Sequence, residues 1–259
     1  MRPDALAVEI RTRAHWEALD LGLALVQTYW RNLYAAWFVA LLPVVLLALA
    51  LTYLLSDYGY GVLLLWWMKP FYDRALLHVL SRAVFGETVD WRGVLRALPG
   101  LLQHSGLFRA LTIGRFTPRR SFRLPIWQLE GISGQTRYRR LHALKGHGAF
   151  SLLFACATFE MILLFGMLGF LVMMLPPELI PSQLDTLFSF YIDNKAQLPF
   201  WFEITCGLTY LFVISVVEPF YVAAGFTLYL NRRTELEGWD IELGFRTLAA
   251  RLEAQQTPS

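Results

Sequence analysis

The sequence predicts an all-α integral membrane protein with four transmembrane helices, arranged as two parallel repeats of two spans each. Three observations predict this fold class: four long apolar windows, an uneven distribution of basic residues, and a phrase that occurs twice. Hydrophobic residues make up 56% of the 259 residues and charged residues only 17%, whereas soluble domains contain about 25% charged residues. The mean hydropathy is +0.44. This composition excludes an ordinary soluble domain.

Four apolar windows are each long enough to cross the hydrocarbon core of a bilayer, which takes about 20 helical residues. They cover residues 35–55, 60–82, 149–175 and 203–230. The first 34 residues are too polar for a cleavable signal peptide, so we expect the first window to remain as an anchor. Within that segment Trp16, Leu23 and Trp30 belong to an apolar series at helical spacing, which predicts a helix at the membrane interface.

The basic residues lie almost entirely on one side of the predicted spans. Twenty of the 23 Lys and Arg residues fall in the N-terminal segment, in the loop between the second and third spans, or in the C-terminal tail. The loop 176–202 contains only Lys195. Because cytoplasmic loops carry the excess of Lys and Arg, we expect both termini and the central loop to be cytoplasmic. The net charge of +3 reflects this imbalance.

The phrase KPFYDRALLHVLSRAVFGETVDW, which begins at Lys69, is partly repeated as EPFYVAAGFTLYLNRRTELEGWD from Glu218. Each copy continues into an amphipathic segment, which predicts a cytoplasmic interfacial helix in each repeat. We therefore expect two units in the same orientation, related by a pseudo-two-fold axis along the membrane normal; a chance match is the alternative. The predicted segments are 1–34, a cytoplasmic interfacial segment; 35–114, the first repeat; 115–145, a basic cytoplasmic loop; and 146–259, the second repeat.

Charged residues inside predicted spans are functional candidates, because a charge in hydrocarbon is costly. This intramembrane set comprises Lys69, Asp73, Arg74, His78, Glu160 and Glu218. Lys69 and Glu218 hold equivalent positions in the two copies, so we expect them to pair; Asp73, four residues after Lys69, is the alternative partner. The set is interpreted either as interhelical pairs that fix packing or as a site for an ion, a proton or a lipid headgroup. Pro70 and Pro219 predict helix kinks.

Turn residues follow each copy of the phrase. Asp90 and Asp240 are suited to N-cap the helices that begin after them, because an Asp side chain accepts hydrogen bonds from free backbone N–H groups. Gly238 is suited to a tight turn. The alternative interpretation of these junctions is a corner that binds a partner.

The central loop GRFTPRRSFRLPIWQLEGISGQTRYRR has seven arginines and one glutamate. Its two prolines and three glycines predict an irregular conformation. Six arginines form a predicted docking surface for anionic headgroups or a cytosolic protein: Arg119, Arg120, Arg123, Arg137, Arg139 and Arg140. No nucleic-acid-binding motif accompanies these charges, so we expect no nucleic-acid partner.

No HExxH, GxSxG, P-loop or paired CxxC motif is present in the sequence, so we predict no catalytic residue, metal or cofactor. Cys156 and Cys206 both lie in predicted spans, where free buried thiols are expected.

The tail LYLNRRTELEGWDIEL and the first copy KPFYDRALLHVLSRAVFGE resemble a family of uncharacterised bacterial inner-membrane proteins with a C-terminal RRxxxEGWDxEL-type phrase. Such proteins are often encoded beside a MoxR-type AAA ATPase, a von Willebrand factor-like protein and a transglutaminase-like membrane protein. The resemblance is specific only in the two phrases. It implies a bacterial inner membrane and cytosolic or membrane protein partners in an AAA ATPase context, and it implies no activity.

These observations predict a non-enzymatic inner-membrane component of an envelope-associated assembly, which docks cytosolic partners or anionic lipid through its basic face. The alternative is a small transporter or lipid-binding membrane protein that uses the intramembrane charged residues. A membrane enzyme comes third, because the sequence contains no recognisable pair of nucleophile and base.

Overall fold

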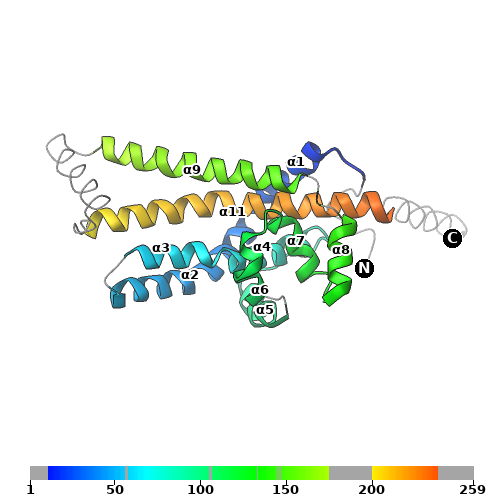
Figure 1. The fold of residues 1–259 in the computed structure, drawn as a ribbon, viewed down its shortest axis with the longest axis horizontal. Coiled ribbons are helices and arrows are strands. Elements are labelled where there is room, and N and C mark those ends of the chain that lie inside the picture. Colours follow the sequence, from blue (N-terminus) through cyan, green and yellow to red (C-terminus); the bar gives the residue numbers. More distant parts are fainter. Residues whose placement is uncertain are drawn as a thin grey trace, which may run out of the picture. The chain divides into compact units, whose positions relative to one another are not determined.

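A computed structural model describes residues 11–55, 58–104, 107–132, 134–144, 146, 148–174 and 200–238. These residues form helices and no strand, so the predicted all-α class is confirmed. The fold contains two units, and Figure 1 labels its helices. Unit 1 combines Met1–Pro43, Met68–Leu153 and Glu218–Ser259, and unit 2 combines Val44–Trp67 and Phe154–Val217. Each unit therefore takes residues from both predicted repeats.

Three helices among the described residues are long and apolar enough to cross a membrane. They are α2 (Trp30–Leu55), α9 (Ala149–Met173) and the stretch Ile204–Glu237 of α11 (Phe200–Glu237). They coincide with the first, third and fourth predicted spans. By length and composition, the chain is a membrane protein.

The segment 60–82, predicted as one span, is not one continuous helix. It is divided between α3 (Tyr58–Trp67) and α4 (Lys69–Ala83), with a turn at Met68. Pro70 stands in the first turn of α4, where a missing backbone N–H costs nothing. It therefore begins a helix and does not kink one. Pro219, in contrast, lies inside α11, which continues as an α-helix on both sides of it.

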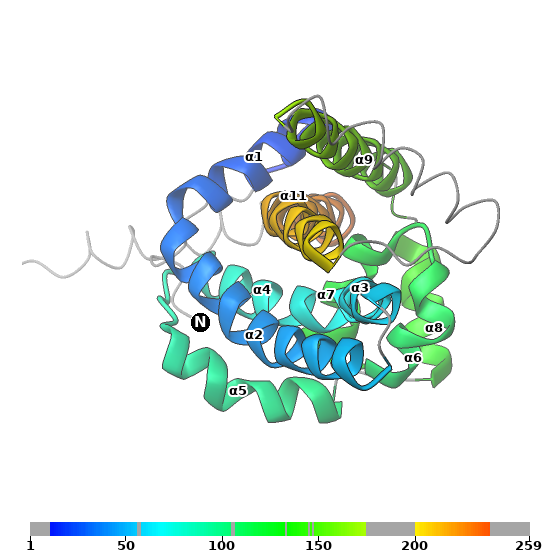
Figure 2. The same ribbon diagram turned by 90° about the vertical axis from the view of Figure 1, so that its left-hand side faces the viewer.

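The core of unit 1 is the C-terminal half of α11, with α1 (His15–Thr28), α4, α7 (Arg120–Gln128) and α8 (Gly134–Leu144) around it (Figure 2). Small residues on α11 allow two of these helices to approach closely. A Cβ on Gly225 would lie 2.3 Å from the Ser121 Cβ of α7, and a Cβ on Gly22 of α1 would lie 2.8 Å from the Ala224 Cα. Both glycines are therefore required by the packing.

The central segment is not irregular, which corrects the prediction from its glycines and prolines. It contains the 3-10 helix η2 (Ile113–Phe116) followed by α7 and α8. Gly131 and Gly134 have φ of 61° and 62°, so they form the turn between α7 and α8, where only glycine avoids strain. The apolar face of α7 is buried and includes Phe122 and Ile126, and this burial holds the segment in helical form.

The amphipathic segments predicted before the first span and after the first copy of the phrase are helical, whereas the segment predicted after the second copy lies beyond Gly238, outside the described residues. In α5 (Trp91–His104), Val94 and Leu98 are buried, whereas Trp91 and Leu95 are exposed. In α1, Trp16 is 78% exposed. The short helix α6 (Leu107–Leu111) follows α5.

Candidate functional site

Lys69 and Glu218 form the ion pair that the repeated phrase predicts. The Lys69 Nζ lies 3.1 Å from the Glu218 Oε2. The two side chains are 6% and 3% exposed. The pair does not stand alone, because Arg120 contacts the other oxygen of the same carboxylate, with Nη2 2.5 Å from the Glu218 Oε1.

Arg120 also contacts Asp73, so a single guanidinium joins two carboxylates. Its Nε lies 3.2 Å from the Asp73 Oδ2, and the Asp73 side chain is 1% exposed. The alternative partner proposed for Lys69 is therefore paired with Arg120. We call Lys69, Asp73, Arg120 and Glu218 the charge cluster. It contains two cations and two carboxylates, which gives the neutrality that buried charges require.

Three helices of unit 1 position the charge cluster. Lys69 and Asp73 lie one turn apart at the start of α4, Glu218 lies on α11, and Arg120 is the first residue of α7. Tyr221, one turn after Glu218, holds α7 in place. The Arg120 guanidinium lies 5.3 Å from the centroid of the Tyr221 ring, and the Ser121 N–H donates to the Tyr221 hydroxyl at 3.3 Å.

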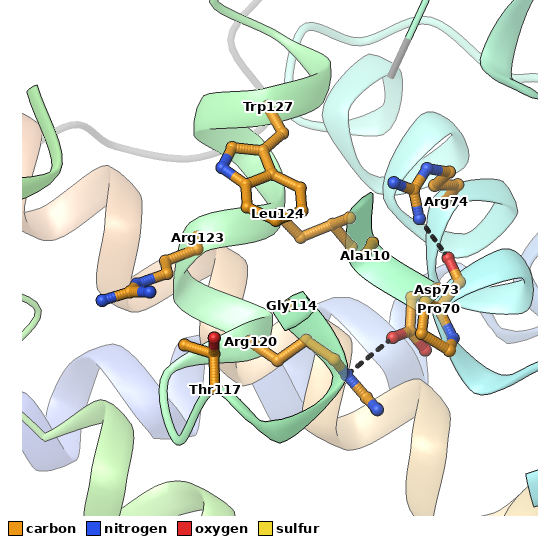
Figure 3. A pocket seen from close by; sticks show the side chains of 10 residues that line it. All are labelled: Pro70, Asp73, Arg74, Ala110, Gly114, Thr117, Arg120, Arg123, Leu124 and Trp127. Atoms are coloured by element: carbon orange, nitrogen blue, oxygen red, sulfur yellow. Dashed lines mark hydrogen bonds and ion pairs between the residues drawn. The ribbon is translucent and has the colours of Figure 1, made fainter. Parts of the chain in front are cut away.

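A small cavity of about 20 Å³ adjoins the charge cluster (Figure 3). It is lined by Pro70, Asp73, Arg74, Arg120, Leu124 and Trp127, among others. A water molecule needs about 10–15 Å³ of such volume, so the cavity has room for about one water or one small group. The lining includes charges of both signs.

The remaining intramembrane candidates are not part of the charge cluster. Arg74 is buried, and it donates from Nη1 to the Pro70 carbonyl. The Gln128 Nε2 donates to the Arg74 carbonyl at 3.0 Å. His78 is half-buried further along α4, and Glu160 is half-buried on the part of α9 that belongs to unit 2.

A second network, which the sequence did not predict, fixes α8 to the end of α11. The Arg140 Nε lies 2.9 Å from the Glu130 Oε2, and the Arg140 Nη2 donates to Glu237. The Tyr229 hydroxyl donates to the Glu130 Oε1 at 2.7 Å, and the Arg233 Nη2 lies 2.7 Å from the Glu237 Oε2. Hydrogen bonds to Glu130 and Glu237 raise the pKa of Arg140 above its ordinary value.

The six arginines predicted as one docking surface fall into two groups. Arg120 belongs to the charge cluster, and Arg140 belongs to the half-buried network at the end of α11. Arg137 donates to the Ile132 carbonyl at 2.7 Å. Of the three others, Arg119 and Arg139 are exposed, whereas Arg123 is half-buried, as are Arg120, Arg137 and Arg140. The sequence does not predict this division, because Arg120 is flanked by Arg119 and Ser121 and its partners Asp73 and Glu218 are distant in the chain.

The predicted turn residues take their expected places where the structure describes them. The Asp90 Oδ1 accepts a hydrogen bond from the Gly93 N–H at 3.0 Å, which is the geometry of an N-cap. Gly238 has φ of 62°, and its N–H donates to the Thr234 carbonyl at the end of α11. Asp240 lies outside the described residues.

The described residues contain no group of His, Cys, Asp and Glu arranged to hold a metal ion. No protein-family model, curated protein or solved structure matches this chain. The case for any function therefore depends on the residues and their geometry.

Proposed function

We propose that this chain is a non-enzymatic component of an envelope-associated assembly in a bacterial inner membrane, and that it docks anionic lipid or a cytosolic partner through basic residues of unit 1. One observation carries the proposal. Of the 23 Lys and Arg residues, all but Lys195 belong to the segments of unit 1. Such a division is typical of a protein with one cytoplasmic side.

The exposed residues of unit 1 support contact with a lipid surface. On α5 the exposed Arg92 lies 5.1 Å from the ring of the exposed Trp91. At the start of α2 the exposed Arg31 lies 5.5 Å from the ring of Trp30. Tryptophan beside arginine favours the boundary between headgroups and acyl chains.

The proposal includes four spans in two parallel repeats, with both termini in the cytoplasm. In this arrangement α3 and the start of α4 together provide the second span. Three helices with the required length and apolar character support it, as does the placement of the basic residues.

A reporter fused after Ser259 is expected to report cytoplasm, and a cysteine at Ser182 is expected to react with an impermeant reagent from outside. Labelling at 182 only after permeabilisation would overturn this topology.

Docking is tested by affinity purification of the full chain from native membranes, followed by mass spectrometry of bound protein and lipid. The variant Arg92→Gln/Arg96→Gln removes two exposed charges from α5, and Lys195→Gln is the control from unit 2. The α5 variant is expected to recover less partner protein or less anionic lipid than the control. Equal recovery from wild type and both variants would contradict docking through the exposed arginines of α5.

The alternative is a small transporter or lipid-binding protein that uses the buried charges. The cavity beside Asp73 and Arg120 favours only the small-ligand form of this alternative, because it has room for about one water or one small group. Under this alternative, Lys69→Met/Glu218→Leu abolishes ligand binding or transport in protein that still folds. Under the leading proposal, the same folded variant keeps its lipid and partner recovery.

A further inference from the structure

Helix α7 presents its arginines on two sides. Arg120 points to Asp73, whereas the guanidinium of Arg123 points away from that ion pair (Figure 3). Arg123 and Trp127 lie four residues apart on α7, and Arg119 occupies the N-cap position just before the helix, four residues before Arg123. We call these three residues the stripe. Arg123 and Trp127 also line the small cavity beside the charge cluster.

The two arginines of the stripe are like charges, one turn apart. Partial burial, and then the neighbouring charge of Arg119, lower the pKa of Arg123. Like charges at this spacing repel each other. In the part of the chain that the structure describes, Arg123 makes no ion pair. The first turn of α7 has no acidic residue, and no side chain caps its N-terminus. The partial positive charge of that terminus adds to the two guanidinium charges.

Neighbouring residues contact both ends of the stripe and help to fix its side chains in position. Gly146 has φ of 51°, and a Cβ there would lie 2.9 Å from the Phe122 Cδ1 and 3.4 Å from the Arg119 Cδ. The glycine therefore lets the chain pass close to the Arg119 side chain. At the other end, the Arg137 guanidinium lies 5.7 Å from the centroid of the Trp127 ring. A third positive charge thus lies at the tryptophan end of the stripe.

We propose that Arg119 and Arg123 bind the phosphate group of an anionic phospholipid. The inference rests on the proposed function, and it narrows the lipid-docking surface to one discrete site. Two guanidinium forks match the oxygens of a phosphate group. Free phosphate has the same chemistry, but the chain is a membrane protein, and Trp127 places an interfacial aromatic ring beside the site.

The experiment measures binding of phosphatidylglycerol to the full-length, delipidated protein in detergent by native mass spectrometry. Diacylglycerol, which lacks the phosphate, and inorganic phosphate are the other two probes. The test variant is Arg119→Gln/Arg123→Gln. The matched control is Arg139→Gln, which removes an exposed arginine of the same central segment. Arg92→Gln/Arg96→Gln reports on the wider docking surface.

Wild type is expected to prefer phosphatidylglycerol over diacylglycerol, and the test variant is expected to lose about 30-fold in affinity for phosphatidylglycerol. The Arg139→Gln control is expected to change that affinity by less than about threefold. Because the test variant could fail to fold, Arg119→Lys/Arg123→Lys provides a second measurement. It keeps both charges, loses the paired fork geometry, and is expected to show a smaller loss than the Gln variant.

Several results would overturn the site. One is a wild-type protein with no preference for phosphatidylglycerol. Another is a folded test variant that binds phosphatidylglycerol as wild type does. If the α5 variant binds phosphatidylglycerol less well in the same experiment, the proposed function stands and only the site at Arg119 and Arg123 fails. Binding of inorganic phosphate that the test variant loses, without any binding of phosphatidylglycerol, would identify a free-phosphate site and also overturn the lipid assignment.

Discussion

Helix α9 in unit 2 and the C-terminal half of α11 in unit 1 place their apolar side chains in opposite ways. In unit 2, α9 exposes large side chains such as Phe159, Ile162 and Phe165, and its most apolar window contains no buried residue. In unit 1, the stretch of α11 from Tyr221 to Tyr229 is buried throughout. An exposed apolar helix is stable where lipid is the solvent, and a buried polar network needs protein around it. The exposed apolar surface of α9 therefore suits lipid, whereas the buried stretch of α11 suits a protein interior.

Helix α11 illustrates the change of surroundings within a single element. It has 38 residues, which is about 57 Å at 1.5 Å per residue, whereas the hydrocarbon core is about 30 Å thick. A large part of α11 therefore lies beyond the core. Glu218, at the first position of the unit 1 part, is surrounded by Lys69, Arg120 and protein side chains. Its charge is tolerated because protein, and not lipid, solvates it.

The largest effect is expected from the loss of Arg120, which joins both carboxylates of unit 1. Arg120→Met leaves Lys69 as the one cation of the charge cluster for Asp73 and Glu218. Breaking a buried ion pair on one side costs about 3–5 kcal/mol, so the free energy of unfolding is expected to fall by that amount. Chemical denaturation in detergent micelles, followed by circular dichroism, measures it. The matched variant Arg139→Met removes an exposed arginine and is expected to change stability by less than about 0.5 kcal/mol. An equal loss of stability in the two variants would contradict the conclusion that Arg120 stabilises both carboxylates.

A double-mutant cycle on Lys69 and Glu218 is expected to show strong coupling. Lys69→Met leaves two carboxylates with one cation, and Glu218→Leu leaves two cations with one carboxylate, so each is expected to cost about 3–5 kcal/mol. The double variant keeps Arg120 with Asp73, which is neutral, and should lose much less than the sum. Strictly additive losses in the same denaturation assay would show that the two residues do not interact.

Exchange of the two charges sharpens the same test. An isolated pair would tolerate Lys69→Glu/Glu218→Lys, because opposite charges remain side by side. In this fold the exchanged lysine would lie beside Arg120, and the glutamate at position 69 would lie near Asp73. The exchange is therefore expected to remain destabilising. Full recovery of stability would mean that Arg120 does not contribute at this position.

The sequence predicted the Lys69–Glu218 pair because equivalent positions in a repeated phrase pointed to it. It did not predict Arg120 as the shared partner, because Arg120 is 98 residues from Glu218 and lies in a segment whose many arginines indicated an outward-facing surface. No local pattern encodes such a distant contact. The break at Met68 was accessible from the sequence, since a proline at the second position is typical of a helix start.

The central segment shows a different limit of sequence analysis. Its glycines and prolines predicted an irregular loop, but Gly131 and Gly134 are confined to the turn between α7 and α8. Burial of the α7 residues Phe122 and Ile126 inside unit 1 stabilises the helix and outweighs the weak helix propensity of the segment. Tertiary packing of this kind overrides propensity, and the sequence alone does not reveal which face is covered.

An intermediate effect is expected where α7 packs against α11. In Gly225→Ala, the new Cβ would lie 2.3 Å from the Ser121 Cβ and 2.7 Å from the Ser121 backbone carbon. The backbone cannot move aside as a flexible side chain does, so α7 must shift. Overpacking of this kind costs about 1–3 kcal/mol, and the same denaturation assay should show a loss in that range. Unchanged stability would mean that α7 is not packed on α11 as the structure shows.

The smallest effect is expected for the matched glycine in unit 2. A Cβ on Gly169 of α9 meets nothing within 4 Å, so Gly169→Ala creates no clash, and alanine is the better helix former. We therefore expect the free energy of unfolding of the isolated chain to stay within about 0.5 kcal/mol of wild type. A loss as large as that of Gly225→Ala would show that another helix covers this face of α9. The exposed apolar side chains of unit 2 would then belong to a protein interface, and the contrast between a lipid-solvated unit and a protein-solvated unit would have to be abandoned.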